Sequence, residues 1–127
     1  MKRRVVITGL GLCTPVGRGV DLFWRSLLTG RSGIGPVTLF DAGSLPVRIA
    51  GEVKGLAIDL LEATFPEANG ERDRKIWLGL DAASQARADA GLGPEQLAEA
   101  ALFVGVSLET FFLDAENALK MKEHRHA

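Results

Sequence analysis

The stretch VVITGLGLCTPVG, residues 5–17, decides how the rest of this chain is interpreted. Its first four residues, 5–8, are β-branched throughout, which predicts a strand buried on both faces. Gly9 and Gly11 follow, and glycine lets the backbone turn or approach a neighbouring element closely. The lone Cys13 comes next. The stretch therefore predicts either a cysteine nucleophile on a glycine-rich turn or the entrance to a fold whose chemistry lies elsewhere.

A nucleophilic role for Cys13 requires that something lower the pKa of its thiol, such as a histidine, a cation or a helix N-terminus. The only histidines, His124 and His126, are at the far end of the chain. We therefore favour a small buried packing residue at position 13. A single cysteine allows no disulfide within the chain, which fits a reducing cytoplasm.

Two further motifs invite a cofactor or a metal, and both are incomplete. A dinucleotide-binding turn requires a third small residue at position 14, where this chain has Thr14 followed by Pro15. His124 and His126 have no nearby cysteine to complete a zinc site, and a solvated terminus explains them as well. We expect no cofactor and no metal site.

Bulk properties describe an ordinary globular protein. The chain has 127 residues, 46% of them hydrophobic and 24% charged, with a formal net charge of -1. This balance provides no overall field for nucleic acid or an anionic membrane, so neither is expected as a partner. No apolar run approaches the roughly 20 residues that span a bilayer. We expect a soluble, cytoplasmic chain of one domain.

Periodicity and turn residues predict an α/β order of elements. An apolar stripe of Phe23, Trp24, Leu27 and Leu28 predicts a helix that begins near Asp21. The other expected elements are a loop over 30–46, a strand over 47–53, helices over 56–65, 72–90 and 94–100, and a strand over 101–107. The strands at 5–8 and 101–107 are expected in one sheet.

The helix over 72–90 carries the strongest packing signal. Ile76, Leu80, Ala83 and Ala90, with Trp77 beside them, are expected to form its buried face. Its many alanines leave little side-chain bulk, so another element is expected to pack closely along it. Two buried strands cover too little of this apolar surface, which indicates that the chain is part of a larger body.

The order of motifs resembles one family. The segment RRVVITGLGLCTPVG, followed by FWRSLLTGRSGIGPVTLFDAGSLPVRIAGEV, is similar to the N-terminus of β-ketoacyl-acyl carrier protein synthases of the type II elongating kind. DRKIWLGLDAASQARADAGL is similar to the long buried helix of that family, and ALFVGVSLETFF to its following strand and turn. The resemblance covers about residues 3–120.

This resemblance implies a thiolase-like layered fold, of which residues 1–127 are the N-terminal part. It also implies a decarboxylative Claisen condensation, in which a cysteine thiolate accepts an acyl group and two histidines assist decarboxylation of malonyl-carrier protein. The implied partners are acyl carrier protein, malonyl and acyl thioesters, and a second copy in a homodimer of the complete enzyme.

None of the three catalytic residues of the family maps onto this chain, because they lie in sequence beyond Ala127. Cys13 falls in the entrance turn, where the family has an ordinary side chain. Leu108 aligns with a residue at the bottom of the family's acyl pocket, often a gate for chain length. Ser107, Glu109 and Thr110 replace a more glycine-rich run there, so a core leucine at a strand end is an equally good interpretation of Leu108.

We therefore expect the N-terminal portion of a synthase for fatty-acid or polyketide elongation, inactive as a separate chain of this length. Two alternatives remain. The chain is a truncated, non-catalytic module that pairs with a full-length synthase, or a small nucleotide-binding protein, which Thr14 argues against. Arg72 and Arg74 are suited to an acidic carrier protein, although a solvated helix start explains them equally well.

Overall fold

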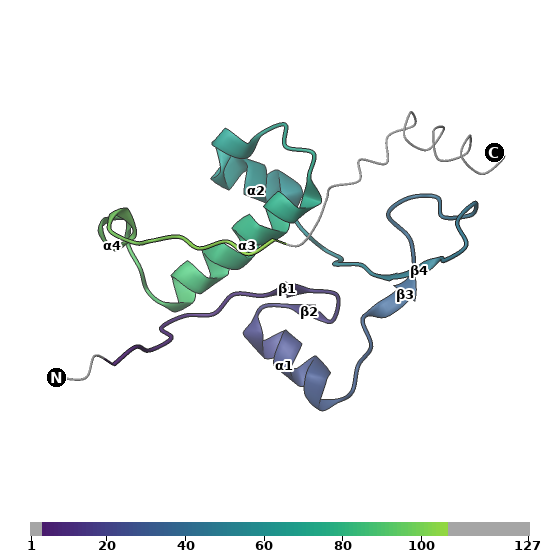
Figure 1. Cartoon of the computed structure of the whole chain (residues 1–127), viewed down its shortest axis with the longest axis horizontal. Coiled ribbons are helices and arrows are strands. Elements are labelled where there is room, and N and C mark those ends of the chain that lie inside the picture. Colours follow the sequence, from purple (N-terminus) through teal and green to yellow (C-terminus); the bar gives the residue numbers. More distant parts are fainter. Residues whose placement is uncertain (1–3, 107–127) are drawn as a thin grey trace.

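The computed structural model describes residues 4–106, and Figure 1 shows the arrangement of their helices and strands. In chain order the elements are β1 (Cys13–Thr14), β2 (Gly17–Arg18), α1 (Val20–Leu28), β3 (Ile34–Pro36), β4 (Ile49–Gly51), α2 (Ile58–Thr64), the 3-10 helix η1 (Pro66–Ala68), α3 (Arg74–Asp89) and α4 (Pro94–Ala98). Helix and strand content is thus mixed, as expected from the sequence.

The strands form two separate antiparallel pairs. β1 pairs with β2 through a tight turn, and β3 pairs with β4 with Gly35 opposite Ala50. The strand expected over 47–53 is therefore present in shorter form as β4. β3 lies inside the stretch expected to be a loop over 30–46, which corrects that expectation. An antiparallel partner explains the difference, because β4 supplies the backbone hydrogen bonds that residues 34–36 need.

Helix α3 has both of the end signals that its sequence carries. The side chain of Asp73 accepts a hydrogen bond from the backbone N–H of Lys75 at 2.9 Å, which satisfies one of the free donors of the first turn. Gly91 follows the last turn with φ of +65°, a conformation that glycine adopts without strain. The helix thus begins and ends where local chemistry favours it.

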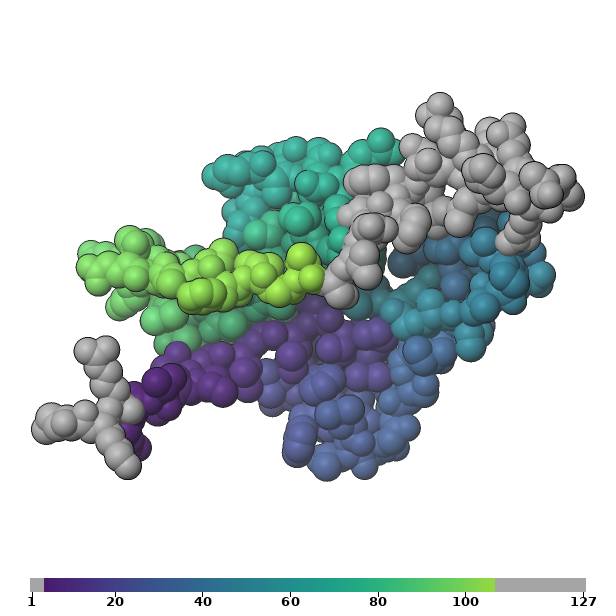
Figure 2. All heavy atoms as spheres, in the orientation of Figure 1, coloured from purple at the N-terminus to yellow at the C-terminus, as the bar shows by residue number. Residues whose placement is uncertain are grey.

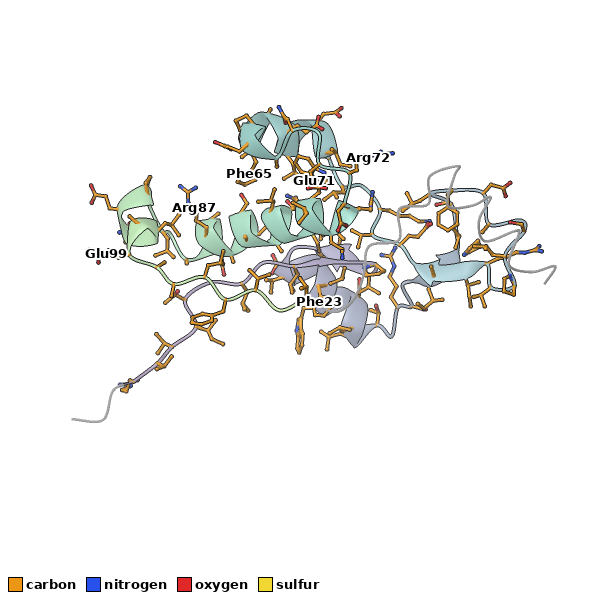
Figure 3. The ribbon with its side chains drawn as sticks, turned by 45° about the horizontal axis from the view of Figure 1, so that its top comes forward. Phe23, Phe65, Glu71, Arg72, Arg87 and Glu99 are labelled. Atoms are coloured by element: carbon orange, nitrogen blue, oxygen red, sulfur yellow. The ribbon has the colours of Figure 1, made fainter. Side chains whose placement is uncertain are left out.

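The buried core of the described residues is small. Its apolar members are Ala42, Leu61 and Trp77, and Trp77 is only 2% exposed. Helix α2 brings Leu61 to α3, and the indole Nε1 of Trp77 donates to the carbonyl of Glu71 at 3.0 Å. Helices α2 and α3 therefore form a compact pair, and Figure 3 shows them side by side.

The segment before β1, residues 9–12 and here called the glycine segment, packs closely against α3. A Cβ atom added at Gly9 would lie 2.6 Å from the backbone nitrogen of Ala90, and one added at Gly11 would lie 2.7 Å from that of Ala86. Both distances are shorter than real contacts allow, so these positions accept only glycine. This confirms the expectation that an element approaches the alanine-rich helix closely, and it explains both glycines.

The two buried strands expected at 5–8 and 101–107 are not formed by the described residues there. Residues 5–8 and 101–106 have no regular secondary structure, and Val5 is 95% and Phe103 92% exposed. Figure 2 shows both stretches on the visible surface. A strand requires backbone partners on a neighbouring strand, and neither stretch has one within residues 4–106. The expected shared sheet is therefore wrong for this part of the chain.

The expected buried faces of two helices also need correction. Trp24 and Leu28 on α1 are 58% and 71% exposed, and Phe23, labelled in Figure 3, is half-buried. On α3, Ile76 is 44% exposed and Ala83 is exposed as well. The face of α3 that the rest of the structure covers is set by Trp77 and by the small residues that admit the glycine segment, not by the largest aliphatic side chains.

Much apolar surface remains uncovered as a result. Exposed large hydrophobic side chains occur on α1, on the β3–β4 pair and on residues 102–106. So much exposed apolar surface is unusual for a chain that stays monomeric. Within residues 4–106, no helix is long and apolar enough to cross a membrane.

The close approach of the glycine segment generates the first prediction. Gly11→Ala should lower the free energy of unfolding by about 1–3 kcal/mol, because the added methyl group forces the segment away from α3. Gly79→Ala is the matched control, because Gly79 lies on α3 itself and a Cβ atom added there has nothing within 4 Å. That change should raise stability by about 0.5–1 kcal/mol through helix propensity.

Urea unfolding followed by far-ultraviolet circular dichroism measures both variants. Equal stability of Gly11→Ala and the parent chain would show that the segment does not pack on α3 as described.

Candidate functional site

Two adjacent rows of side chains on α3 receive the N-terminal segment. The first, here called the polar row, consists of Asp81, Gln85 and Asp89. The second, the alanine row, consists of Ala82, Ala86 and Ala90, and Ala90 is the C-cap residue of α3. Residues four apart lie on one side of an α-helix, so each row forms a continuous stripe. The alanine row admits Gly9 and Gly11.

The polar row binds the same segment through hydrogen bonds. The backbone N–H of Leu10 donates to Asp89 Oδ2 at 2.9 Å, and that of Leu12 donates to Gln85 Oε1 at 3.4 Å. Further along, the Cys13 thiol donates to Asp81 Oδ2 at 2.6 Å. Contacts therefore advance along the segment as they retreat along α3, and the two run antiparallel.

Asp81 is the centre of this arrangement. It is 2% exposed, and a buried carboxylate is costly unless it is paired and hydrogen-bonded. Arg18 on β2 supplies the pair: its Nε donates to Asp81 Oδ2 at 2.7 Å and its Nη2 to Oδ1 at 2.5 Å. This two-pronged geometry is the strongest form of arginine–carboxylate contact.

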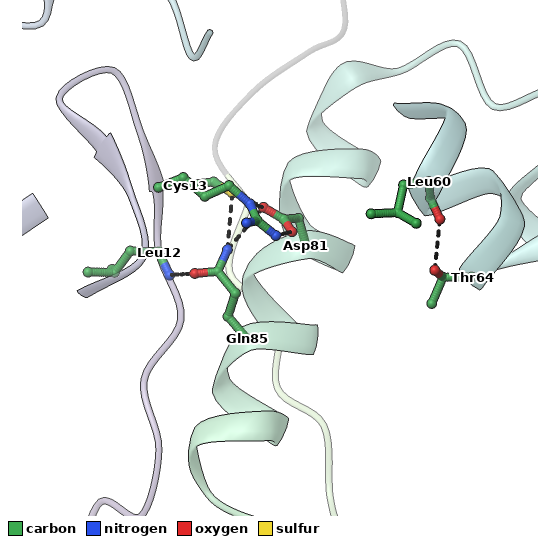
Figure 4. Close-up of polar contacts among 7 residues, drawn as sticks. Leu12, Cys13, Leu60, Thr64, Asp81 and Gln85 are labelled. Carbon is green, nitrogen blue, oxygen red and sulfur yellow. Dashed lines mark hydrogen bonds and ion pairs between the residues drawn. The ribbon is translucent and has the colours of Figure 1, made fainter. Parts of the chain in front are cut away.

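Gln85 completes the cluster one turn along the helix. Its Nε2 donates to Asp81 Oδ2 at 3.0 Å and lies 3.7 Å from the Cys13 sulfur, as Figure 4 shows. Since its Oε1 also accepts from Leu12, one amide side chain connects the segment to the buried acid. We call Cys13, Arg18, Asp81 and Gln85 the Asp81 cluster.

Hydrogen bonds and burial set the protonation states of the cluster. The hydrogen bonds from Arg18 hold the pKa of Asp81 below its ordinary value, although burial acts in the opposite direction. Burial raises the pKa of the Cys13 thiol to about 11, and the hydrogen bond to the Asp81 carboxylate contributes to the same shift. At neutral pH Asp81 is therefore ionised and Cys13 remains a protonated thiol.

This chemistry decides between the two interpretations of Cys13. A nucleophilic cysteine needs a lowered thiol pKa, and the pKa here is raised. The expectation of a simple buried packing residue is also incomplete, because Cys13 is half-buried and donates a hydrogen bond. The cluster holds the β1–β2 turn on α3 and has no group poised for acid, base or nucleophilic catalysis.

A second buried acid, Glu52, organises the stretch that follows β3. Its carboxylate accepts from the backbone N–H groups of Thr38 and Leu39 at 2.8 and 3.0 Å and from the Thr38 hydroxyl at 2.7 Å. These bonds hold the pKa of Glu52 below its ordinary value. Both oxygens are thus engaged, and Glu52 serves to hold the chain after β3.

The remaining sequence-based candidates lie outside the described residues. Leu108, His124 and His126 all fall beyond residue 106, so the acyl-gate and metal interpretations stay predictions. Arg74 is engaged structurally, since its Nη2 donates to the carbonyl of Val53 at 2.5 Å. Within residues 4–106 no group of three or more potential ligands could hold a metal ion.

Sequence reasoning missed the Asp81 cluster, although a signal was present. Asp81, Gln85 and Asp89 recur every four residues beside alanines of the same spacing, which marks one helix face as polar but closely approached. The prediction instead placed the buried face of this helix at its aliphatic residues, Ile76, Leu80 and Ala83.

Comparison with known proteins gives a consistent result. A family model described as "Beta-ketoacyl synthase, N-terminal domain" matches residues 2–127. The chain is 42% identical over 95 residues to "3-oxoacyl-[acyl-carrier-protein] synthase 2" of Coxiella burnetii, covering 72% of this chain and 22% of that protein. A protein of the same name from Vibrio harveyi is 41% identical over 107 residues, covering 84% of this chain and 25% of the relative.

A polyketide relative is similar to nearly the same degree. "Granaticin polyketide putative beta-ketoacyl synthase 2" of Streptomyces violaceoruber is 40% identical over 96 residues, which cover 74% of this chain and 22% of that protein. The chain thus spans about a quarter or less of the length of these relatives.

The protonated state of Cys13 generates the second prediction. Since its thiol pKa is raised from 9.0 to about 11, the thiolate fraction at about pH 8, and with it the iodoacetamide alkylation rate, should be about 100-fold lower than for a free cysteine. Asp81→Asn should speed alkylation because the carboxylate that opposes ionisation is gone. Asp59→Asn, an exposed change on α2, is the control and should leave the rate unchanged.

Alkylation is measured by mass spectrometry, with chain unfolded in urea as the free-cysteine reference. Equal rates in folded and unfolded chain would contradict the described environment of Cys13.

The Arg18–Asp81 pair generates the third prediction. Because folding lowers the pKa of Asp81, its contribution to stability is complete above the ordinary carboxylate pKa and is lost as the pH falls through the folded pKa. Arg18→Gln should destabilise the chain by roughly 1–3 kcal/mol at neutral pH, since the buried carboxylate loses its partner. It should also raise the pKa of Asp81, so that acid unfolding begins at a higher pH.

Urea unfolding over a series of pH values tests this, with Arg25→Gln as the control. Arg25 is exposed on α1 and makes one long bond, from Nε to the Asp21 carbonyl at 3.3 Å. Identical acid-unfolding profiles for Arg18→Gln and Arg25→Gln would refute the role of the pair.

Proposed function

This chain belongs to the β-ketoacyl synthase family, and we propose that it is the N-terminal part of a 3-oxoacyl-[acyl-carrier-protein] synthase. The observation that carries the proposal is the family match over residues 2–127. Relatives named as a 3-oxoacyl-[acyl-carrier-protein] synthase and as a polyketide beta-ketoacyl synthase are similar to comparable degrees. The proposal therefore covers both fatty-acid and polyketide chain elongation.

The complete enzyme, on this proposal, catalyses a decarboxylative Claisen condensation. An acyl group is transferred from carrier protein to a cysteine thiolate, malonyl-carrier protein loses carbon dioxide, and the resulting carbanion attacks the acyl thioester to give a 3-oxoacyl thioester. The nucleophile and the two assisting histidines are supplied by sequence beyond Ala127. The raised pKa of Cys13 supports this assignment, since it argues against a nucleophile within the described residues.

The described residues act, in this proposal, as scaffold for a thiolase-like layered fold. The uncovered stretches 5–8 and 101–106 are rich in β-branched and aromatic residues, which suits strands that complete a sheet with further polypeptide. The exposed side chains of α1 are suited to cover by the same polypeptide. Residues 1–127 are thus one part of a domain rather than a unit in themselves.

We infer the remaining features of the proposal from the resemblance to the family. The enzyme is cytoplasmic, works without a cofactor or metal, and forms a homodimer when complete. Acyl carrier protein and malonyl and acyl thioesters are its partners, and nucleic acid and membranes are not. Leu108 is retained as a candidate gate at the bottom of the acyl pocket.

The fourth prediction concerns the size and activity of the native polypeptide. An antibody raised against this chain should detect a protein several times larger than 13.6 kDa in extracts of its source cells, because 95 residues make up only 22% of a relative. The immunopurified large protein should convert acyl- and malonyl-carrier protein to a 3-oxoacyl product. The separate chain of 127 residues should not.

A native band at 13.6 kDa with no condensing activity would overturn the proposal. The truncated module that pairs with a full synthase would then be the better account, and co-precipitation of a larger synthase with the small band would identify it.

A further inference from the structure

The turn between η1 and α3 presents an asparagine followed by glycine. Asn69 and Gly70 are both exposed, and they lie just before Glu71 and Arg72, which Figure 3 labels at the start of α3. Gly70 has φ of +86°, in the left-handed region that glycine adopts without strain. Nothing lies within 4 Å of a Cβ atom added at Gly70, so the turn is open on that side.

Hydrogen bonds hold the residues on either side of Gly70 but not Gly70 itself. The N–H of Asn69 donates to the Pro66 carbonyl at 3.2 Å, and the N–H of Glu71 donates to the Ala68 carbonyl at 3.0 Å. Among the described residues, the Gly70 N–H has no acceptor. The nitrogen that follows the asparagine side chain is therefore accessible to water and free to react.

We propose that Asn69–Gly70 is a site of spontaneous covalent modification, at which the chain forms a succinimide. The Gly70 amide nitrogen loses its proton to hydroxide and attacks Cγ of Asn69. The new bond between Cγ and the Gly70 nitrogen closes a five-membered ring, and the Cγ–Nδ2 bond breaks. The side-chain nitrogen Nδ2 of Asn69 leaves as ammonia after taking a proton from water. Water then adds to either ring carbonyl and opens the ring to aspartate or isoaspartate at position 69.

The structure favours this reaction in two ways. Ring closure requires rotation about the Cα–C bond of Asn69, where ψ is 132°, and no hydrogen bond of the Gly70 N–H opposes that rotation. Gly70 also has no side chain to block the approach of its nitrogen to Cγ. The other asparagine, Asn117, is followed by Ala118, whose methyl group hinders the same attack.

Modification at this turn changes both charge and geometry. A carboxylate at position 69 joins Glu67, Glu71 and Asp73 in a short stretch. The isoaspartate form also adds one carbon to the backbone between positions 69 and 70. The next residue is Glu71, whose carbonyl accepts the indole N–H of Trp77. The modification thus acts at the point where the chain enters α3.

The fifth prediction tests the site in the full chain and needs no enzymatic activity. The purified chain is incubated at about pH 8, and peptide mass spectrometry follows both asparagines over days. We expect deamidation at Asn69 many-fold faster than at Asn117, a rate that increases with pH, and labelling of the product by an isoaspartate-specific carboxyl methyltransferase. Asn69→Gln should abolish the methyl labelling, because glutamine must close a less favourable six-membered ring.

A synthetic peptide of residues 66–72 provides the unfolded reference. A rate in the folded chain close to that of the peptide supports the open turn. An unmodified Asn69 in a chain whose peptide reacts, or equal rates at Asn69 and Asn117, would overturn the proposal.

Discussion

The burial of one carboxylate, that of Asp81, constrains the rest of the described structure. An ionised group at 2% exposure is tolerated only with a full set of donors. Arg18, Cys13 and Gln85 supply them from two separate parts of the chain. Because the donors have fixed directions, they determine how the β1–β2 turn sits on α3, and α1 follows directly from β2.

The alanine row gives this contact its closeness, and the polar row gives it its register. Small residues alone would let the N-terminal segment slide along α3, since one alanine resembles the next. The bonds from Leu10 to Asp89 and from Leu12 to Gln85 remove that freedom. Packing without side-chain bulk and hydrogen bonding at fixed positions thus act together, one row for each task.

The helices and the close approach of the glycine segment were predictable because they depend on local chemistry. α3 has an aspartate cap at one end and a glycine at the other. Gly9 and Gly11 are the residue type that a close approach of two backbones requires. The strands expected at 5–8 and 101–107 are wrong for the described residues, because a strand is defined by partners that local sequence does not name. The covered face of α3 was misjudged for a related reason: Asp81 looks like a surface residue until Arg18 is placed beside it. Family membership was predictable because it depends on the order of motifs.

The separation in sequence between the two halves of the Asp81 cluster has a consequence for synthesis on the ribosome. Cys13 and Asp81 are 68 residues apart, so the glycine segment leaves the exit tunnel well before α3 has been synthesised. At about 5–20 residues per second, the interval is roughly 3–14 s. During that time the segment from Gly9 to Cys13 has no helix to pack on. Val5, Val6 and Ile7, which are exposed even in the described structure, precede it as an apolar stretch suited to a ribosome-associated chaperone.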